Sequence, residues 1–216
     1  MKIIDLTGPL ENGMWSYGKP FTPYRMKRLS TMAEDGYIAS EIVLTTHTGT
    51  HIDCPRHFGE ERAAIDSIPL ETYYGDAVLL DISGKSVSGS TITKTMLLDA
   101  GADKIASGDI CVVNTGWYKR WNDNDYEENY PKFTPDSVSL LTDRGVKLLA
   151  TDIPIIGDPE STDTDMVLCE KGIPSIYALT NLGELPEKFK FAAFPLRIKD
   201  GDGSPVRAVA IMEDEE

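Results

Sequence analysis

The sequence predicts a single α/β domain built around a mixed sheet. Three observations support this prediction. Short apolar runs alternate with amphipathic segments through the second half of the chain, strand-like segments stand at both ends, and no repeat, linker or low-complexity tract divides the 216 residues. Alternating strands and helices are typical of a layer with parallel strands, and the end strands add antiparallel pairs. A chain of this length can bury the core of one domain.

The expected strands are short and mostly apolar, as buried strands are. They cover residues 2–6, 40–47, 76–82, 110–117, 146–153 and 173–179. Residues 189–212 are predicted to form two more strands around an Asp-Gly-Asp-Gly turn, and therefore a hairpin. The segment between the first two strands is rich in glycine and proline. It also carries aromatic side chains, among them Trp15, Tyr17, Phe21 and Tyr24.

Helices are expected between the later strands, over residues 93–107, 134–145 and 161–172. The second has the most complete signals. Thr134 suits the N-cap, Pro135 the first helical position, and Gly145 the position after the helix end. Gly172 closes the third helix in the same way. The acidic tail, residues 213–216, is expected to be solvated.

Composition excludes several classes of partner. The net charge is −14 at pH 7, which argues against nucleic acid and anionic membranes, because both require patches of Lys and Arg. No apolar run has the length of a signal peptide or a membrane span. Three cysteines form no paired framework, so we expect a cytoplasmic protein with reduced thiols. Its expected partner is a small-molecule substrate.

Every histidine of the chain lies within "TTHTGTHIDCPRHF", residues 45–58. His47, His51 and His57 are interleaved with Asp53. Imidazole and carboxylate together are the ligand set of zinc, manganese or iron. Two plainer interpretations are chance clustering and three structural histidines. The interleaved carboxylate and the many neighbouring hydroxyl groups favour a metal site.

Elementary geometry restricts how such a site could form. A straight strand would separate His47 from His51 by about 13 Å, too far for one metal ion. The surrounding threonines and glycine disfavour a helix. Because Gly49 can adopt a positive φ, we expect the chain to bend there and bring both histidines and Asp53 to one point. A further turn would place His57 beside them. Three ligands, an open coordination position and a free histidine are typical of a catalytic metal site.

The stretch H-T-G-T-H-I-D-C-P-R-H-F resembles the HxGTHxDxPxHF signature of the cyclase/formamidase family, which includes bacterial kynurenine formamidase and isatin hydrolase. The likeness extends to residues 3–15, 107–117, 143–154 and 171–186. It implies a swivelling β/β/α fold that assembles as a homodimer or homotetramer. It also implies that His47, His51 and Asp53 hold the metal, and that His57 is a base or a ligand of a second metal. The ligand types suit Zn²⁺ or Mn²⁺.

Two positions depart from the family pattern HxxLLxxGIPxxEN. Asp165 stands where the pattern has histidine, and Tyr177 stands where it has glutamate. Asp165 could ligate a metal or orient a histidine. Tyr177 is a phenol with a pKa of about 10 and a poor replacement for a carboxylate ligand. The resemblance therefore implies a one-metal site comparable with that of isatin hydrolase more than a two-metal formamidase site.

The function that these features predict is hydrolysis of a small amide, imide or lactone. A metal-activated water would attack the carbonyl, with His57 as the base. Tyr177 is expected either to donate a hydrogen bond to the oxyanion or to lie in the core or at a dimer interface. A metal-dependent lyase or cyclase on the same scaffold, and a non-catalytic metal-binding protein, remain alternatives. The substrate is not identified, although the aromatic N-terminal segment mildly favours a planar one.

Other residues near the motif allow two interpretations each. Cys54 could be a thiolate ligand or a small buried filler. Arg56 could bind a substrate carboxylate or be a solvated or ion-paired arginine. No GxSxG motif indicates a serine hydrolase. The tryptophans could line an aromatic pocket or belong to the core: Trp15, Trp117 and Trp121.

Overall fold

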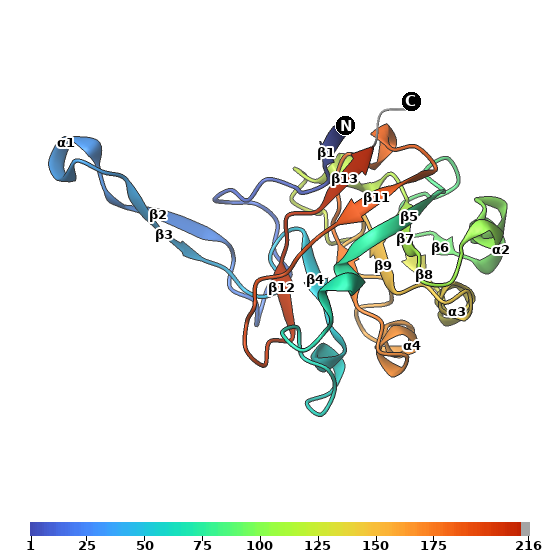
Figure 1. Cartoon of the computed structure of the whole chain (residues 1–216). Helices are drawn as coiled ribbons and strands as arrows, with labels where there is room; N and C mark the ends of the chain where they lie inside the picture. Colours follow the sequence, from blue (N-terminus) through green and yellow to red (C-terminus); the bar gives the residue numbers. More distant parts are fainter. Residues whose placement is uncertain (213–216) are drawn as a thin grey trace.

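The structure of the chain is a computed structural model that describes residues 1–212, so the acidic tail lies outside the described residues. These residues form a nine-stranded mixed sheet that curls on itself (Figure 1). Its strands, in spatial order, are β1 (Lys2–Asp5), β13 (Val209–Met212), β11 (Lys188–Ala192), β5 (Tyr74–Asp81), β7 (Ile110–Asn114), β9 (Leu148–Thr151), β10 (Ser175–Tyr177), β4 (His51–Asp53) and β12 (Gly203–Pro205). The predicted α/β class with a mixed sheet is confirmed.

The centre of the sheet is parallel and its flanks are antiparallel. Strands β5, β7, β9 and β10 run in one direction, whereas β11 on one side and β4 on the other pair antiparallel with them. All residues of β7, β9 and β10 are buried. This pattern explains why these segments are continuous apolar runs in the sequence, because parallel strands are covered on both faces.

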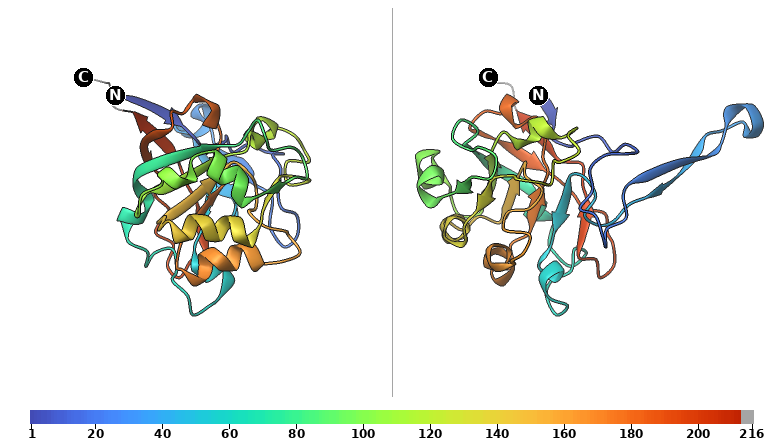
Figure 2. Two further views of the ribbon diagram at one scale, coloured as in Figure 1. Left: turned by 90° about the vertical axis from the view of Figure 1, so that its right-hand side faces the viewer. Right: turned by 180° about the vertical axis from the view of Figure 1, so that it is seen from behind.

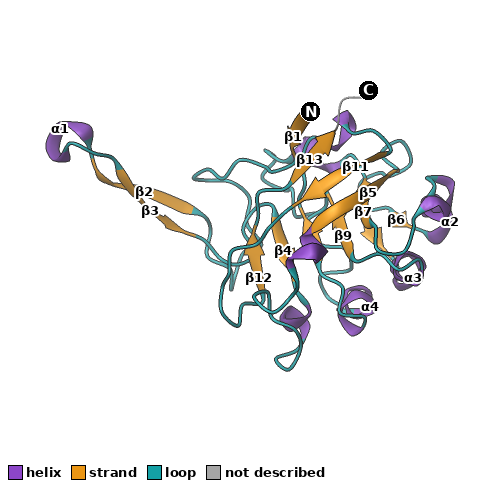
Figure 3. Cartoon of the chain, in the orientation of Figure 1, coloured by secondary structure: helices purple, strands orange, loops and turns teal. Residues whose placement is uncertain are grey.

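Three helices cover one face of the sheet (Figures 1 and 3). They are α2 (Lys94–Asp99), α3 (Pro135–Asp143) and α4 (Asp163–Glu170). Helix α3 begins with the predicted cap, since Thr134 and Ser137 exchange side-chain and backbone hydrogen bonds in a capping box. Helix α2 ends earlier than predicted, because Gly101 adopts φ 99° and the chain continues in a 3-10 turn. Among residues 1–212, no helix has the length and apolarity that crossing a bilayer requires.

The two faces of the sheet bury separate hydrophobic clusters. Along β5, Val78 and Leu80 pack toward the helices, whereas Ala77 and Leu79 pack into the other cluster with Phe191. Alternate residues of a strand point to opposite faces, so one strand supplies both clusters. A parallel pair between β6 (Thr91–Ile92) and β8 (Lys132–Phe133) lies at the helical side.

The predicted C-terminal hairpin is wrong in its connection. Strands β11 and β13 do pair antiparallel, but the chain between them does not turn directly back. It travels to the opposite edge of the sheet and forms β12, which pairs antiparallel with β4. The Asp-Gly-Asp-Gly turn therefore lies beside the histidine segment and not at the end of a hairpin. Local turn chemistry predicts the turn but not the strand that it precedes.

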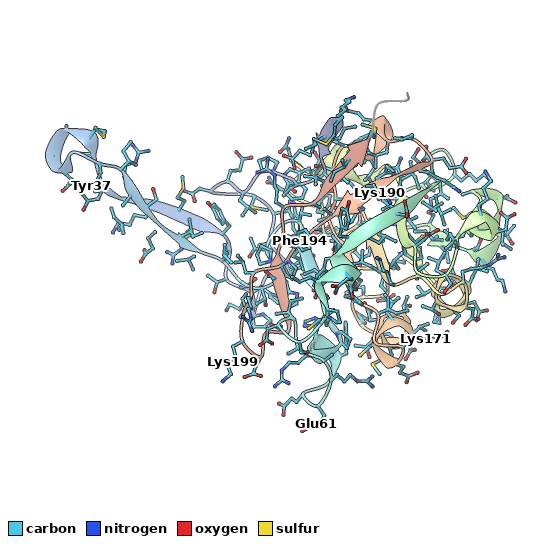
Figure 4. The ribbon with its side chains drawn as sticks, viewed as in Figure 1. Tyr37, Glu61, Lys171, Lys190, Phe194 and Lys199 are labelled. Carbon is cyan, nitrogen blue, oxygen red and sulfur yellow. The ribbon has the colours of Figure 1, made fainter. Side chains whose placement is uncertain are left out.

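A two-stranded arm, residues 25–43, projects away from the body of the molecule (Figures 1 and 2). It consists of β2 (Arg25–Ser30), β3 (Ala39–Val43) and the short helix α1 (Met32–Asp35) at its tip. Tyr37 lies at the far end (Figure 4). The predicted strand 40–47 is right only up to residue 43, and β2 and α1 were not predicted. Their side chains are largely exposed, so the sequence carries no pattern of burial there.

Candidate metal centre

The first two histidines flank a sharp bend, as the glycine between them predicts. Gly49 has φ 63°, in the left-handed region that favours glycine. A Cβ atom at this position would lie 2.6 Å from the Leu10 side chain, so a larger residue would have to displace its neighbour as well. The chain leaves the bend as β4, whose alternate residues His51 and Asp53 point to the same side.

His47, His51 and Asp53 form a compact buried group. His47 Nδ1 lies 2.7 Å from Asp53 Oδ1, and His51 Nε2 lies 3.3 Å from the same oxygen. His51 Nδ1 lies 2.8 Å from the carbonyl oxygen of Gly49, which can only accept a hydrogen bond. That contact leaves Nε2 of His51 free to face Asp53. One ligand atom of each residue lies within 4.8 Å of the other two, and this donor set fits a divalent metal ion.

The electrostatics of the group favour a cation. Burial acts to raise the pKa of Asp53, but the charges and hydrogen bonds of His47 and His51 hold that pKa far below its usual value. Burial acts to lower the pKa of His47, but the carboxylates of Asp53 and Asp202 raise it to about 9. Without a metal ion, a proton on His47 therefore balances the buried carboxylate. A divalent cation would displace that proton.

His57 lies beside this group and contacts a carboxylate that the sequence did not indicate. It belongs to the 3-10 helix Pro55–Phe58, and its ring centroid lies 4.2 Å from that of His47. His57 Nε2 lies 4.0 Å from Asp53 Oδ2, while its Nδ1 lies 3.4 Å from Asp202 Oδ2. The same Asp202 oxygen lies 2.8 Å from His47 Nε2. Because 155 residues separate Asp202 from His47, no sequence spacing could have linked them.

Asp165 and Tyr177, the positions that depart from the family pattern, contact each other at the wall of the site. Tyr177 on β10 pairs with His51 on β4, and its hydroxyl donates to Asp165 Oδ1 at 3.4 Å. The Ser175 hydroxyl donates to Tyr177 Oη at 2.8 Å. Burial and the charge of Asp53 raise the pKa of Asp165 to about 7. Within residues 1–212, Asp165 joins no cluster of three ligand atoms, so its role as a metal ligand stays a prediction.

A pocket with a cavity volume of about 180 Å³ opens onto the histidine group. Its aromatic and apolar walls come from the segment before the arm, from the histidine segment and from the loop after β9: Tyr17, Phe21, Phe58, Pro154, Ile155 and Pro159. In the part of the chain that the structure describes, no Lys or Arg lines this pocket. Sites for drug-sized ligands measure roughly 300–1,000 Å³, so this pocket suits a small molecule.

The other candidate residues do not line this pocket. The Cys54 thiol donates to the carbonyl oxygen of Asp202 at 3.2 Å, and burial raises its pKa to about 11. Among residues 1–212, Cys54 belongs to neither group of possible metal ligands, which favours a buried filler. Arg56 donates to the carbonyl oxygen of Glu60 at 2.6 Å. The tryptophans belong to the hydrophobic core: Trp15, Trp117 and Trp121.

The fold and this buried donor set define an α/β protein with a candidate centre for a divalent metal ion. The sequence model of the Cyclase family matches residues 4–157, and the chain belongs to this family. The kynurenine formamidase of Salinibacter ruber is 31% identical over 168 residues, which are 77% of this chain and 76% of that protein. The kynurenine formamidase of Paracidovorax citrulli is 30% identical over 212 residues, which are 96% of this chain and 95% of that protein.

A solved structure shares the fold. An isatin hydrolase bound to the product analogue thioisatinate superposes with a TM-score of 0.89 and covers 99% of this chain and 93% of its own. Its sequence identity with this chain is 22%. The family resemblance stated from the histidine motif is confirmed by these comparisons.

Metal affinity should rise with pH, because the metal ion and a proton compete for His47. The pKa of His47 is about 9 in the metal-free protein, so binding below that pH must release one proton. We expect affinity for Zn²⁺ to increase about tenfold per pH unit between about pH 6 and pH 8. Chelator competition at several pH values measures this slope, and calorimetry in two buffers counts the released protons. A pH-independent affinity without proton release would contradict the prediction.

Proposed function

We propose that the protein hydrolyses the C–N bond of a small, uncharged amide or imide, with one Zn²⁺ or Mn²⁺ ion bound by His47, His51 and Asp53. The observation that carries this proposal is the position of the three ligand atoms, within 4.8 Å of one another beside a small pocket. When bound, the divalent ion would lower the pKa of a water molecule and polarise the substrate carbonyl. Three buried free cysteines suit a reducing compartment, consistent with a cytoplasmic enzyme.

His57 is the group placed to move the proton. Its Nε2 faces Asp53 from the pocket wall, whereas Nδ1 faces Asp202, so Nε2 is the atom that can accept the proton of the attacking water. The water oxygen bonds to the carbonyl carbon and the C–N bond breaks. The proton then passes from His57 to the leaving nitrogen, which gives a carboxylic acid and an amine. His47 and His51 are not free for this step, because they are the proposed ligands of the metal ion.

Tyr177 is suited to stabilise the negative charge that develops on the carbonyl oxygen. Its hydroxyl already accepts a hydrogen bond from Ser175 and donates only a long one, 3.4 Å, to Asp165. Burial and the charge of Asp165 raise the pKa of Tyr177 well above its usual value, so the phenol keeps its proton. A neutral donor at the pocket wall can redirect its hydrogen toward an oxyanion.

The charge of the pocket restricts the substrate. Within residues 1–212 the lining has no Lys or Arg, and it includes the carboxylates of Asp158 and Asp165. A substrate carboxylate would find no Lys or Arg in this lining to pair with. Asp158 is already paired with Lys132 at 3.2 Å, and an ionised Asp165 would repel the carboxylate. Tyr17, Phe21 and Phe58 instead offer aromatic faces to a planar ring. Of the activities named among the relatives, hydrolysis of isatin, an uncharged cyclic amide, suits this lining better than hydrolysis of a formylated amino acid.

We further propose that the arm binds a second copy of the chain and makes a homodimer. Its large apolar side chains are half exposed or more: Met26, Leu29, Met32, Tyr37, Ile38 and Ile42. A lone two-stranded hairpin is marginally stable in water, so these side chains require cover. Strand β2 carries Arg25, Lys27 and Arg28 and no acid, whereas the whole chain has a net charge of −14. The acidic body of a second copy complements this basic strand.

Replacing His51 by Ala should remove both metal and activity, whereas replacing His57 by Ala should remove only activity. His51 supplies a ligand atom, and His57 supplies the base, which typically contributes about 10²–10⁴-fold to the rate. Mass spectrometry of tag-free protein should find about one metal ion per chain in the wild type and in His57→Ala. Loss of metal from His57→Ala would make His57 a ligand. Hydrolysis in ¹⁸O-water should place one labelled oxygen in the acid product, which an elimination would not.

Uncharged substrates should be hydrolysed with a higher kcat/KM than analogues that carry a carboxylate. A matched pair is isatin and isatin-5-carboxylate, and a second pair is formanilide and N-formylkynurenine. We expect the difference to lie mainly in KM, because the missing cation affects binding and not the reacting atoms. Equal or better turnover of the carboxylate in both pairs would show that the proposed charge selection is wrong.

Gel filtration with light scattering should give twice the mass of the chain for the wild type. The triple variant Met32→Ser, Tyr37→Ser, Ile38→Ser should be monomeric, because it removes apolar area only at the tip of the arm. Val87→Ser, at an exposed valine outside the arm, is the matched control and should remain dimeric. A monomeric wild type, or a triple variant that stays dimeric, would contradict the assignment of the arm.

A further inference from the structure

Asp202 is held in a fixed position beside the histidine segment. It directly precedes β12, in which Gly203 pairs with Asp53 across the sheet. The carbonyl oxygen of Asp202 accepts hydrogen bonds from the backbone N–H of Cys54 at 3.1 Å and from its thiol at 3.2 Å. A Cβ atom at Gly203 would lie 2.6 Å from the carbonyl oxygen of Ile52 and 3.1 Å from the His47 ring. The backbone here is therefore packed directly against the ring of a metal-ligand candidate.

The Asp202 carboxylate contacts the outer nitrogen of two histidines. Its Oδ2 lies 2.8 Å from His47 Nε2 and 3.4 Å from His57 Nδ1. The remaining nitrogens, His47 Nδ1 and His57 Nε2, both face Asp53. A carboxylate accepts hydrogen bonds and cannot donate them when ionised. With a metal ion on the Asp53 side, both histidines would carry N–H on the side of Asp202 and turn the bare opposite nitrogen toward the site.

We propose that Asp202 is a positioning residue that fixes the tautomer and orientation of His47 as a metal ligand and of His57 as the base. The role of His57 as the base rests on the proposed function, whereas the contacts of Asp202 with both histidines do not. A neutral imidazole has two tautomers, and only the one with a bare nitrogen toward the site can ligate or accept a proton. Carboxylates that hold the outer N–H of a metal-bound histidine serve this purpose in many metal sites. Here one carboxylate would serve two rings.

A direct ligand role for Asp202 is the competing explanation, since His47, His57 and Asp202 also offer three ligand atoms within 4.8 Å. Two observations favour positioning. The two nitrogens of one imidazole point in opposite directions. One metal ion therefore cannot be bound by both nitrogens of His47, and a metal ion on the Asp53 side leaves Asp202 on the far side of the ring. The Asp202 side chain is 42% exposed, whereas that of Asp53 is 10% exposed and contacts all three histidines. Asp53, which is more buried and contacts more histidines, is therefore the better candidate for the ligand.

The test compares Asp202→Ala and Asp202→Asn with the wild type and with Asp200→Asn. Asp200 is exposed, belongs to the same turn and has φ 56°, a conformation that asparagine tolerates, so Asp200→Asn removes the same charge without moving the turn. Zinc affinity is measured by chelator competition, and kcat and KM are measured separately. Far-UV circular dichroism confirms folding. Long-range ¹H–¹⁵N spectra of the zinc-loaded proteins report the tautomers, and the chain has only three histidines to assign.

We expect Asp202→Ala to lower zinc affinity and kcat about 10–100-fold each. KM should change by no more than about twofold, since Asp202 does not line the pocket. The spectrum should show His57 leaving the Nδ1–H tautomer in Asp202→Ala and keeping it in Asp202→Asn, whose side-chain oxygen still accepts a hydrogen bond. Asp200→Asn should match the wild type in every measurement.

Two results would overturn the proposal. Complete loss of zinc from Asp202→Asn, equal to that of Asp53→Asn, would make Asp202 a ligand. An unchanged His57 tautomer in folded Asp202→Ala, with unchanged zinc affinity, would show that Asp202 positions neither ring. Both measurements are independent of turnover. If the wild type hydrolyses no substrate, the proposed function fails while the zinc affinity and the spectra still decide the role of Asp202.

Discussion

The buried carboxylate of Asp53 is the group on which the rest of the site depends. A carboxylate in a protein interior is costly unless nearby groups compensate its charge, and removing one partner of such a pair typically costs about 3–5 kcal/mol. Three histidine rings surround Asp53, the nearest with its Nδ1 at 2.7 Å. A proton on His47 compensates the charge in the metal-free protein, and a divalent ion can do so more completely. The sequence therefore places all its histidines around one negative charge.

The order of the strands in the sheet explains how side chains from distant parts of the sequence meet at the site. Strand β4 lies between β10 and β12, and it pairs antiparallel with both. Tyr177 on β10 lies beside His51. Asp202, directly before β12, contacts His47. In both pairs the two residues are more than a hundred positions apart in the sequence. Helix α4 adds Asp165 from the covered face. The chain between β11 and β12 crosses to the opposite edge of the sheet, and this crossing brings Asp202 beside the histidines.

Sequence reasoning succeeded where the determining interactions are local. The capping box of α3 and the bend at Gly49 depend on neighbours within a few residues, so Thr134 and Gly49 could be interpreted directly. It failed where the determining contact is distant. Residues 200–203 carry the signals of a turn, and nothing in their neighbourhood indicates that β12 will pair with β4. The arm was missed for another reason, because exposed strands show no alternation of buried and exposed residues.

The two departures from the family pattern limit the positive charge that the site can hold. A second divalent ion would need further anionic ligands, but burial raises the pKa of Asp165 to about 7 and keeps Tyr177 a neutral phenol. Tyr177 and Asp165 satisfy each other by a hydrogen bond, and Ser175 completes the network. Because the carboxyl group of Asp165 is partly protonated near pH 7, this wall offers a second metal ion less negative charge than an ordinary carboxylate would. One metal ion is the arrangement that these charges favour. The acidic side chains in the pocket lining, Asp158 and Asp165, match an uncharged substrate better than an anionic one.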